Sequence, residues 1–434
     1  MAAIACGQDL RGSDRQPDES GSAEPGVCAG SELFSGEGAA VRFRCVQPGA
    51  ELVRILHVLH SLDQQYGGPI RAVLDLSARS VALGMESEVV GFGPVSIPDN
   101  PFPCERIHGL PVSFPRPYRY SRAFPRWLED NLGRFDGVIL HGMWLYPNWA
   151  AARACRRTRV PYVCFPHGML EPWALYGQGP VKAVKKTSYW LLRERAIFRH
   201  ASAIFFTTER ERTLAQQTFH LPSTNFIVVP YGVDRAGATP ERPERPDLGI
   251  PANRKMALFL GRVHPKKNVH FLVEAWAKSG LGPDWELVIA GPVEPAYRQK
   301  LARVINLYNI QAQVRFVGAV SGNDKTYLLG RASWFLLPSK QENFGISVLE
   351  AVNAGCPVAI SDQVYLSDYF HDQSEILPLQ IEAWVGFLRD RMPDEHHRQT
   401  LVRLDREFLV PKFSIGAVTR NWVRTITKAF AETG

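Results

Sequence analysis

The chain has 434 residues, of which 45% are hydrophobic and 21% are charged, and it carries a formal net charge of +7. This length allows two or three domains that each bury a core, and the composition is ordinary for a soluble globular protein. No apolar run approaches the roughly 18–20 residues that a membrane-spanning helix needs. The seven cysteines show neither metal-site spacing nor a disulfide framework, so we expect a reducing, cytoplasmic compartment.

Residues 1–50 are rich in Gly, Ser, Asp and Glu and contain no apolar block. Too little apolar surface is present there to offset the entropy cost of ordering the chain. We therefore expect a disordered leader or a misassigned start. The positive charge of the whole chain fits nucleotide phosphates, an anionic membrane or nucleic acid, and charge alone does not distinguish among them.

From residue 53 short apolar runs alternate with helical stretches, which predicts an α/β protein with parallel sheets and crossover helices. The expected strands are 53–59, 87–91, 137–141, 161–165, 203–207 and 226–230 in the first half, and 256–260, 286–290, 314–317, 334–337 and 357–360 in the second. Residues 235–251 are rich in proline and charge and indicate an exposed connector. Residues 380–430 indicate helices, and the last of them spans about 414–431.

Two elements of the first half are predicted to face a ligand. Gly67 and Gly68 follow the first strand and precede a helix, where glycine allows a ligand to approach the backbone closely, although a simple tight turn has the same pattern. His167 follows the strand 161–165 by two residues, at the sheet edge where ligands of parallel α/β folds bind. His141 ends the neighbouring strand and is a weaker candidate.

In the second half, a buried strand leads into Gly261-Arg262-Val263-His264-Pro265-Lys266-Lys267-Asn268. A cationic loop between a strand and a helix N-terminus is a favourable place for phosphate. Arg262 offers a planar fork to phosphate oxygens, and Lys267 offers a mobile point charge, with Lys266 as a less certain neighbour.

A strand–loop–helix unit with two carboxylates follows, in Glu342-Asn343-Phe344-Gly345-Ile346-Ser347-Val348-Leu349-Glu350-Ala351. The strand 334–337 precedes it, and free backbone N–H groups at the helix start suit a polar, anionic ligand. The small residues of Ala354-Gly355-Cys356-Pro357 let the helix end abruptly before the next strand.

These motifs resemble those of the retaining glycosyltransferases of family 4 (group 1), and the resemblance covers nearly all of the chain from residue 53. It implies the GT-B fold, with two Rossmann-like domains (51–235 and 250–412) facing across a cleft and a C-terminal helix (413–434) returning to the first. The run from His167 to Leu175 resembles enzymes of bacterial surface polysaccharide synthesis. By this resemblance Arg262 and Lys267 hold the donor diphosphate, Glu342 lies near the donor sugar, and Glu350 binds the ribose.

The same resemblance implies that His167 contacts the donor sugar and that Gly67, Gly68, Phe344, Gly345 and Ile346 belong to the substrate-binding set. The implied reaction moves a hexose from a UDP- or GDP-sugar to a glycan or lipid-linked acceptor, in lipopolysaccharide or exopolysaccharide synthesis, with retention of configuration. No Asp-x-Asp element is present, so we expect metal-independent chemistry and no cofactor. The alternatives are a non-hydrolysing sugar-nucleotide 2-epimerase and a basic nucleic-acid-binding protein, but no nucleic-acid fold signature accompanies the basic residues.

Two basic segments suggest a peripheral contact with the inner face of the cytoplasmic membrane. In the first, Arg116, Arg119, Arg122 and Arg126 alternate with Tyr118, Tyr120 and Phe124; in the second, Lys182, Lys185, Lys186 and Arg193 lie on one side of a helix and Val184, Trp190, Leu191 and Phe198 on another. The alternative is an ordinary helix that packs its apolar side on the sheet.

Overall fold

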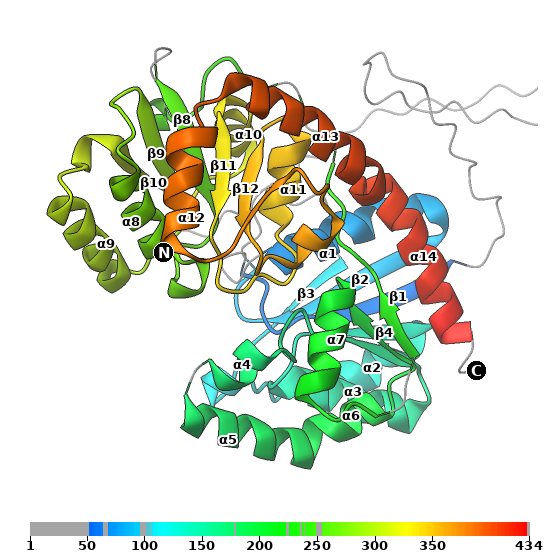
Figure 1. The fold of residues 1–434 in the computed structure, drawn as a ribbon. Helices are drawn as coiled ribbons and strands as arrows, with labels where there is room; N and C mark the ends of the chain where they lie inside the picture. Colours follow the sequence, from blue (N-terminus) through cyan, green and yellow to red (C-terminus); the bar gives the residue numbers. More distant parts are fainter. Residues whose placement is uncertain are drawn as a thin grey trace, which may run out of the picture. The chain divides into compact units, whose positions relative to one another are not determined.

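The computed structural model describes residues 52–63, 68–95, 102–103, 106–177, 179–222, 225–234, 237, 239–248 and 254–431. The expected leader, 1–50, and Gly67 lie outside these residues. Two parallel sheets account for the two halves that the alternation of strands and helices predicts (Figure 1).

The first sheet has seven parallel strands in the order β3-β2-β1-β4-β5-β6-β7. Its strands are β1 Val53–Val58, β2 Met85–Phe92, β3 Ile107–Leu110, β4 Gly137–His141, β5 Tyr162–Phe165, β6 Ala203–Phe206 and β7 Asn225–Val228. Its helices are α1 Gly68–Ser80, α2 Phe124–Asn131, α3 Tyr146–Thr158, α4 Pro172–Tyr176, α5 Pro180–Tyr189, α6 Arg195–Arg199 and α7 Glu209–Thr218. We call this part the first lobe. The strand order reverses between β1 and β4, which is the topological switch point where such sheets bind ligands.

The second sheet has six parallel strands in the order β10-β9-β8-β11-β12-β13. Its strands are β8 Lys255–Leu260, β9 Trp285–Ala290, β10 Val314–Gly318, β11 Trp334–Leu337, β12 Val358–Ser361 and β13 Glu375–Leu377. The helices that follow or cover them are α8 Val269–Ser279, α9 Pro295–Leu307, α10 Gly322–Arg331, α11 Ile346–Asn353, α12 Ile381–Gly386 and α13 Glu395–Phe413. This part is the second lobe, and its switch point lies between β8 and β11.

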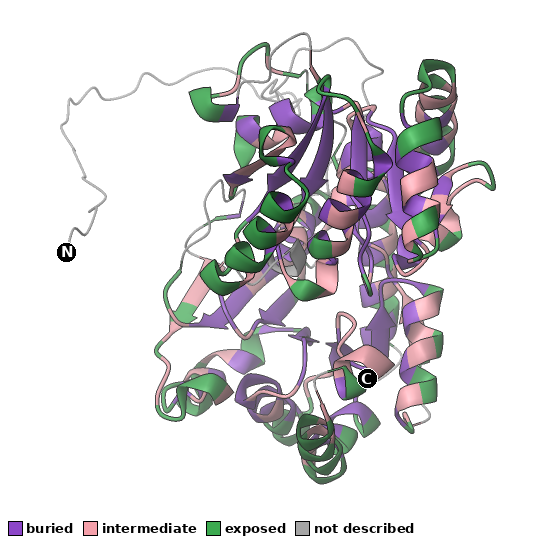
Figure 2. Ribbon diagram, turned by 60° about the vertical axis from the view of Figure 1, so that its left-hand side comes forward, coloured by how far each residue is buried: buried purple, intermediate pink, exposed green. Residues whose placement is uncertain are grey.

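Every strand predicted from the sequence is present to within two residues at each end. Two strands were not predicted, β3 and β13, and each forms an edge of its sheet. An edge strand is only partly covered and is short, so it lacks the continuous apolar run that marks a central strand. Figure 2 shows that the strands are largely buried inside, while the exposed residues lie mostly on the outer faces of the helices.

The last helix, α14 Ile415–Ala431, packs on the first lobe as expected. Its Trp422 is 1% exposed, with ring centroids 6.2 Å from His57 and 6.4 Å from Phe165. Near its end the Phe430 ring covers Gly137 so closely that a Cβ at that glycine would clash with it. The chain therefore runs back from the second lobe to close the core of the first (Figure 1).

Most described residues of the connector 235–251 are exposed, as the sequence predicts, but a few contacts anchor the connector. Among its described residues, Leu248 is fully buried, and Asp324 of α10 accepts hydrogen bonds from the backbone N–H groups of Glu244 at 2.7 Å and Arg245 at 3.2 Å. The connector thus packs on the second lobe, because a single apolar side chain and a buried carboxylate anchor it. In the described part of the chain, no helix combines the length and hydropathy that crossing a membrane requires.

Candidate functional site

The cationic loop begins where β8 ends. Gly261 has a φ of 153°, and its carbonyl oxygen lies so near Gly291, which follows β9, that a Cβ at Gly291 would be only 1.9 Å away. Glycine is therefore required at this close approach of two strand ends. Asn268 ends the loop in the left-handed conformation, which asparagine tolerates better than most residues, with a φ of 58°. This backbone brings the loop to the carboxyl edge of the second sheet.

Three cations gather in this loop. Arg262 is exposed, and its charge, together with that of Lys266, lowers the pKa of Lys267 after the larger effect of burial, to about 7. The ammonium of Lys267 also forms an ion pair with the carboxylate of Glu342, which favours the charged lysine. Because the backbone brings these like charges together, a bound anion would reduce the repulsion between them.

Glu342 is held by its backbone as well as by Lys267. Its N–H donates to the carbonyl of Gln363 at 3.0 Å, and its own carbonyl accepts from the N–H of Tyr365 at 3.0 Å. The side chain is 18% exposed, so one edge remains open to solvent. The predicted neighbours Lys267 and Glu342 are thus brought together, 75 residues apart in the chain.

The helix α11 starts at the predicted place. Gly345 is its N-cap residue with a φ of 88°, and Ile346 is the first helical residue. Phe344 is 2% exposed and packs edge-on against Tyr231 and Phe413, so its side chain belongs to the core, and only its backbone can face a ligand. Glu350 forms an ion pair with Lys325 of α10 at 2.7 Å.

His167 lies at the carboxyl end of β5, with a φ of 51°, in a chain of hydrogen-bonded imidazoles. Its Nε2 is 2.8 Å from Nδ1 of His141, whose Nε2 is 2.9 Å from Nδ1 of His57, and Nε2 of His57 is 3.3 Å from the hydroxyl of Ser77. At the other end, Nδ1 of His167 is 2.5 Å from the hydroxyl of Tyr231.

Burial lowers the pKa of His57 and of His167 to about 3 and that of His141 well below its ordinary value. All three rings are therefore neutral at physiological pH, and each donates from one nitrogen and accepts at the other. Both ring nitrogens of His167 are used within the first lobe. A sugar hydroxyl could reach one of them only by displacing His141 or Tyr231.

Two buried carboxyl groups of the first lobe contact the residues directly before and after Glu342. Glu171, 1% exposed, accepts a hydrogen bond from Gln341 and another from the hydroxyl of Tyr365 at 3.0 Å. Glu211, fully buried, accepts from the N–H groups of Thr207 at 2.7 Å and Gly168 at 2.6 Å.

Asn343, on the other side of Glu342, completes the connection. With its amide nitrogen toward the carboxyl groups, it donates to Glu211 at 3.0 Å and to Glu171 at 3.2 Å. Burial and then Glu211 raise the pKa of Glu171 to about 8, so it is protonated at neutral pH. We call this arrangement, Glu171 and Glu211 with Gln341 and Asn343, the carboxyl clamp, because it grips the Glu342 loop from both sides.

The sequence reasoning missed the carboxyl clamp, His57 and the role of Tyr231. Glu171 stands four residues after His167 in a run that was already singled out, but its partners are 170 and 194 residues away. The only local signal is an acid directly before the Pro172 that opens α4. Of the glycine loop, Gly68 is the first residue of α1, while Gly67 lies outside the described residues.

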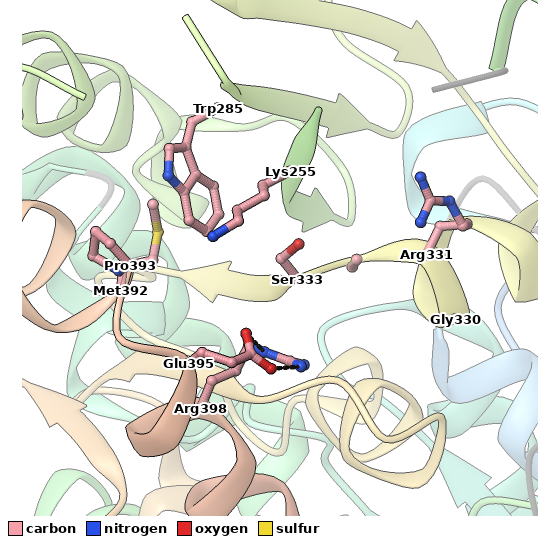
Figure 3. Close-up of a pocket in the computed structure, with 10 residues that line it drawn as sticks. Lys255, Trp285, Gly330, Arg331, Ser333, Met392, Pro393, Glu395 and Arg398 are labelled. Carbon is pink, nitrogen blue, oxygen red and sulfur yellow. Dashed lines mark hydrogen bonds and ion pairs between the residues drawn. The ribbon is translucent and has the colours of Figure 1, made fainter. Parts of the chain in front are cut away.

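A separate cavity of about 240 Å³ is lined by Lys255, Trp285 and the Glu395–Arg398 ion pair, among others (Figure 3). Lys255 and Trp285 begin β8 and β9, so this cavity opens at the amino ends of the strands. Ligands of parallel α/β sheets bind at the opposite, carboxyl edge. The cavity is therefore not part of the candidate site.

Comparisons with known proteins concern the family and the fold of the chain. Residues 67–232 match the family model described as glycosyl transferase 4-like domain, and residues 240–398 match that of the glycosyl transferases group 1. The chain is 26% identical over 285 residues to a D-inositol 3-phosphate glycosyltransferase of Jonesia denitrificans, covering 61% of this chain and 65% of that protein. It is 26% identical over 150 residues to the O-antigen chain mannosyltransferase B of Escherichia coli, covering 33% and 38%.

The chain spans 30% to 65% of the lengths of the first three curated relatives. Among solved structures it resembles Anabaena Alr3699/HepE in complex with UDP and glucose, with a TM-score of 0.69 at 15% identity, over 87% of this chain and all of that one. It also resembles WaaG, a glycosyltransferase involved in lipopolysaccharide biosynthesis, with a TM-score of 0.66 at 18% identity, over 86% and 99%. At these identities the structural likeness concerns the fold.

Proposed function

The chain belongs to the group 1 glycosyltransferases of GT-B fold, and on this premise we propose that it transfers a hexose from a UDP- or GDP-sugar to a glycan or lipid-linked acceptor, with retention of configuration. The observation that carries the proposal is the gathering of Arg262, Lys266 and Lys267 opposite Glu342 at the carboxyl edge of the second sheet. A leaving diphosphate develops negative charge as the glycosyl bond breaks, and preorganised cations stabilise that charge.

Each residue then has a role in the reaction. Arg262 and Lys267 neutralise the diphosphate, and the ion pair with Lys267 is exchanged for a phosphate contact when the donor binds. Glu342, released from that ion pair, anchors sugar hydroxyls beside the reacting carbon. Glu350 leaves its ion pair with Lys325 and accepts hydrogen bonds from the ribose hydroxyls. His167 borders the sugar with a neutral ring, and a sugar hydroxyl that bonds to the ring displaces His141 or Tyr231.

We assign no nucleophile to the protein. The departing phosphate takes the proton of the acceptor hydroxyl, which attacks from the face that the leaving group vacates, so the configuration is kept. The chemistry proceeds without a metal ion because the two cations supply the charge that a metal would otherwise provide. Activity that disappears in EDTA and returns with a divalent cation would contradict this part of the proposal.

Relatives named as an O-antigen chain mannosyltransferase and a D-inositol 3-phosphate glycosyltransferase support a sugar-containing acceptor and a place in cell-surface polysaccharide synthesis. Contact with the cytoplasmic face of the membrane would bring the enzyme to such an acceptor. It is supported by large apolar side chains exposed beside the basic helix α5, at Tyr176, Val181, Val184, Leu191 and Leu192, with exposed fractions from 62% to 81%. We call these five residues the α5 patch.

The α5 patch differs from the arrangement expected from the sequence. Of the predicted apolar side, Trp190 and Phe198 are buried, but Val184 and Leu191 face outward. Exposed Lys182 and Lys185 stand among them, and this combination suits an anionic lipid surface. Liposome sedimentation tests it: Leu191→Ser with Leu192→Ser should weaken binding to anionic vesicles, and Leu307→Ser, at an equally exposed leucine of α9, should not. Equal loss in both variants, or no binding by the wild type, would contradict the proposal.

The enzymatic proposal is tested by a thermal-shift screen against UDP, GDP, ADP and their sugars, followed by NMR of the product formed from the stabilising donor. We expect one nucleoside diphosphate family to raise the melting temperature, and a glycoside with the anomeric configuration of the donor to form. Epimerisation at C2 of the donor in the absence of any acceptor would favour the epimerase instead. No stabilisation by any nucleotide would contradict a donor site.

A further inference from the structure

A second cavity, with basic lining residues, lies in the first lobe at the switch point of its sheet. It has a volume of about 420 Å³ and is lined by His60, Arg116, Pro117, Arg119 and Leu145. His60 follows β1 by two residues, and Leu145 follows the end of β4 by four. These two strands are neighbours across the reversal of strand order, which is where open parallel sheets bind their ligands.

The two arginines come from a short turn that the sequence arranges for them. Arg116 belongs to the 3₁₀ turn Arg116–Tyr118, and Arg119 caps the turn with a φ of 56° and donates its N–H to the carbonyl of Arg116 at 3.0 Å. The guanidinium of Arg119 reaches toward Gly93, just after β2, where a Cβ would lie 3.5 Å from Nη1. The turn therefore brings both cations to the carboxyl edge of β1 and β2.

The charge of this cavity has one sign. Its described lining contains two arginines and a histidine and no carboxylate. Burial and then the charge of Arg119 lower the pKa of His60 to about 4, so the ring is neutral and can accept or donate a hydrogen bond. Arginine presents several N–H donors in a planar fork that matches phosphate oxygens. A phosphate group is the ligand that these residues fit best.

The cavity also borders the reacting centre. A Cβ at Gly142 would lie 3.6 Å from Nδ1 of His60 and 3.4 Å from Cε of Met169, which stands two residues after His167. His60 lies close enough to His167 that a proton on His60 would lower the pKa of His167. Donor phosphates are assigned above to the cations of the second lobe. An anion held near His60 therefore comes from the other substrate.

We propose that Arg116, Arg119 and His60 bind a phosphate group of the acceptor, so that the acceptor is a phosphate monoester or a diphosphate of a sugar or a lipid. This inference rests on the proposed function, because it presumes that a glycosyl acceptor enters the first lobe. It also accounts for the position of the α5 patch: the hydroxyl of Tyr118, from the turn that carries Arg116, is 2.6 Å from the hydroxyl of Tyr189 at the end of α5. A lipid-linked diphosphate held by the turn would keep its chain beside that patch.

The test is calorimetry on the full chain saturated with the nucleoside diphosphate that stabilises it, so that the donor site is filled. Inorganic phosphate, glucose 1-phosphate and a water-soluble short-chain isoprenyl diphosphate are titrated in turn. We expect wild-type protein to bind at least one of the phosphate-bearing organic probes, and Arg119→Gln and Arg116→Gln to weaken it by about tenfold or more each. Arg122→Gln is the matched control, since Arg122 is exposed on the same segment but does not line the cavity.

The probes distinguish the source of the phosphate. Tighter binding of the isoprenyl diphosphate names a lipid-linked acceptor, and tighter binding of glucose 1-phosphate names a soluble phosphorylated sugar. Affinity that is unchanged in both arginine variants, or equal losses in Arg122→Gln, would overturn the inference, as would a wild type that binds none of the probes. Nucleotide binding by the wild type is measured first, so its failure, which contradicts the proposed function, is recorded separately.

Discussion

From the carboxyl clamp we predict an effect on catalysis that depends on the protonation of Glu171. Glu171 accepts hydrogen bonds from Gln341 and Tyr365, and both donors belong to the second lobe. In Glu171→Ala both lose their acceptor, and a buried donor left without a partner costs about 1–3 kcal/mol. The contact between the lobes should then weaken by about 2–6 kcal/mol. If the clamp positions Glu342 for reaction, kcat should fall by at least about 30-fold.

Glu171→Gln should behave differently, because the neutral amide has the shape of the protonated acid and still offers an oxygen to both donors. The pKa of Glu171 is raised to about 8 by burial and then by Glu211, while Lys266, the hydroxyl of Tyr365 and Arg210 oppose that shift. In the native protein the carboxyl group of Glu171 therefore stays protonated well above 4.5, the ordinary pKa of glutamate. The carboxyl clamp weakens only as the pH rises through about 8. At pH 7 the glutamine variant should stay within about twofold of the wild type.

The assay is kcat measured from pH 6 to 9 for the wild type and both variants. The ratio of Glu171→Gln to wild type isolates this carboxyl group, because every other titration is common to the two proteins. We expect that ratio to rise above pH 8 as Glu171 ionises beside Glu211. A glutamine variant as impaired as the alanine variant at pH 7, or a ratio that stays flat to pH 9, would refute the protonated clamp.

Three further predictions follow from single contacts. Lys267, with its pKa near 7, should lose its charge as the pH rises, so the affinity for the donor should fall between pH 7 and 9 in the wild type. In Lys267→Arg that affinity should stay nearly constant, because arginine keeps its charge. The same fall in affinity with pH in both proteins would contradict this. By NMR, His167 should remain neutral from pH 5 to 8, and a titration midpoint of His167 near pH 6.5 would be inconsistent with its place among the buried, hydrogen-bonded imidazoles. Tyr231→Phe removes one hydrogen-bond partner of the His167 ring, so it should change the tautomer signals of His167 and lower kcat about fivefold. Trp422→Ala should reduce the free energy of unfolding by about 3–5 kcal/mol in urea titrations, against little change for the exposed control Arg420→Ala.

The fold was predictable because central strands of parallel sheets are buried on both faces and appear in the sequence as short, continuous apolar runs. Trp334–Leu337 is such a run, and it forms β11 with the predicted bounds. The placement of Arg262 and Lys267 after a strand was predictable for the same reason, since every parallel strand ends at the same edge. Gly345 and Asn268 occupy left-handed backbone, which glycine and asparagine tolerate best.

Contacts between distant residues were not predictable. Glu171 appears in the sequence as a surface acid beside a proline, and only the packing of the two lobes buries it against Gln341. Helical spacing separates two sides of α5 and of the helical turn Trp190–Glu194 that follows it, but it does not say which side faces the sheet. The exposure of Val184 and Leu191 therefore depends on the neighbours of these segments. The chain from His57 to His167 needs three strands in register, which no local pattern contains.

The central claim is that a diphosphate binds between Arg262 and Lys267. Its most direct test is to measure how much the second phosphate of the nucleotide contributes to the affinity for the protein. Calorimetry compares the nucleoside diphosphate with its monophosphate, in the wild type and in the Arg262→Ala, Lys267→Met double variant. We predict that the wild type prefers the diphosphate by at least about tenfold, as one charge-assisted hydrogen bond would give, and that this preference nearly disappears in the double variant. A double variant that keeps the full preference of the wild type would contradict the account.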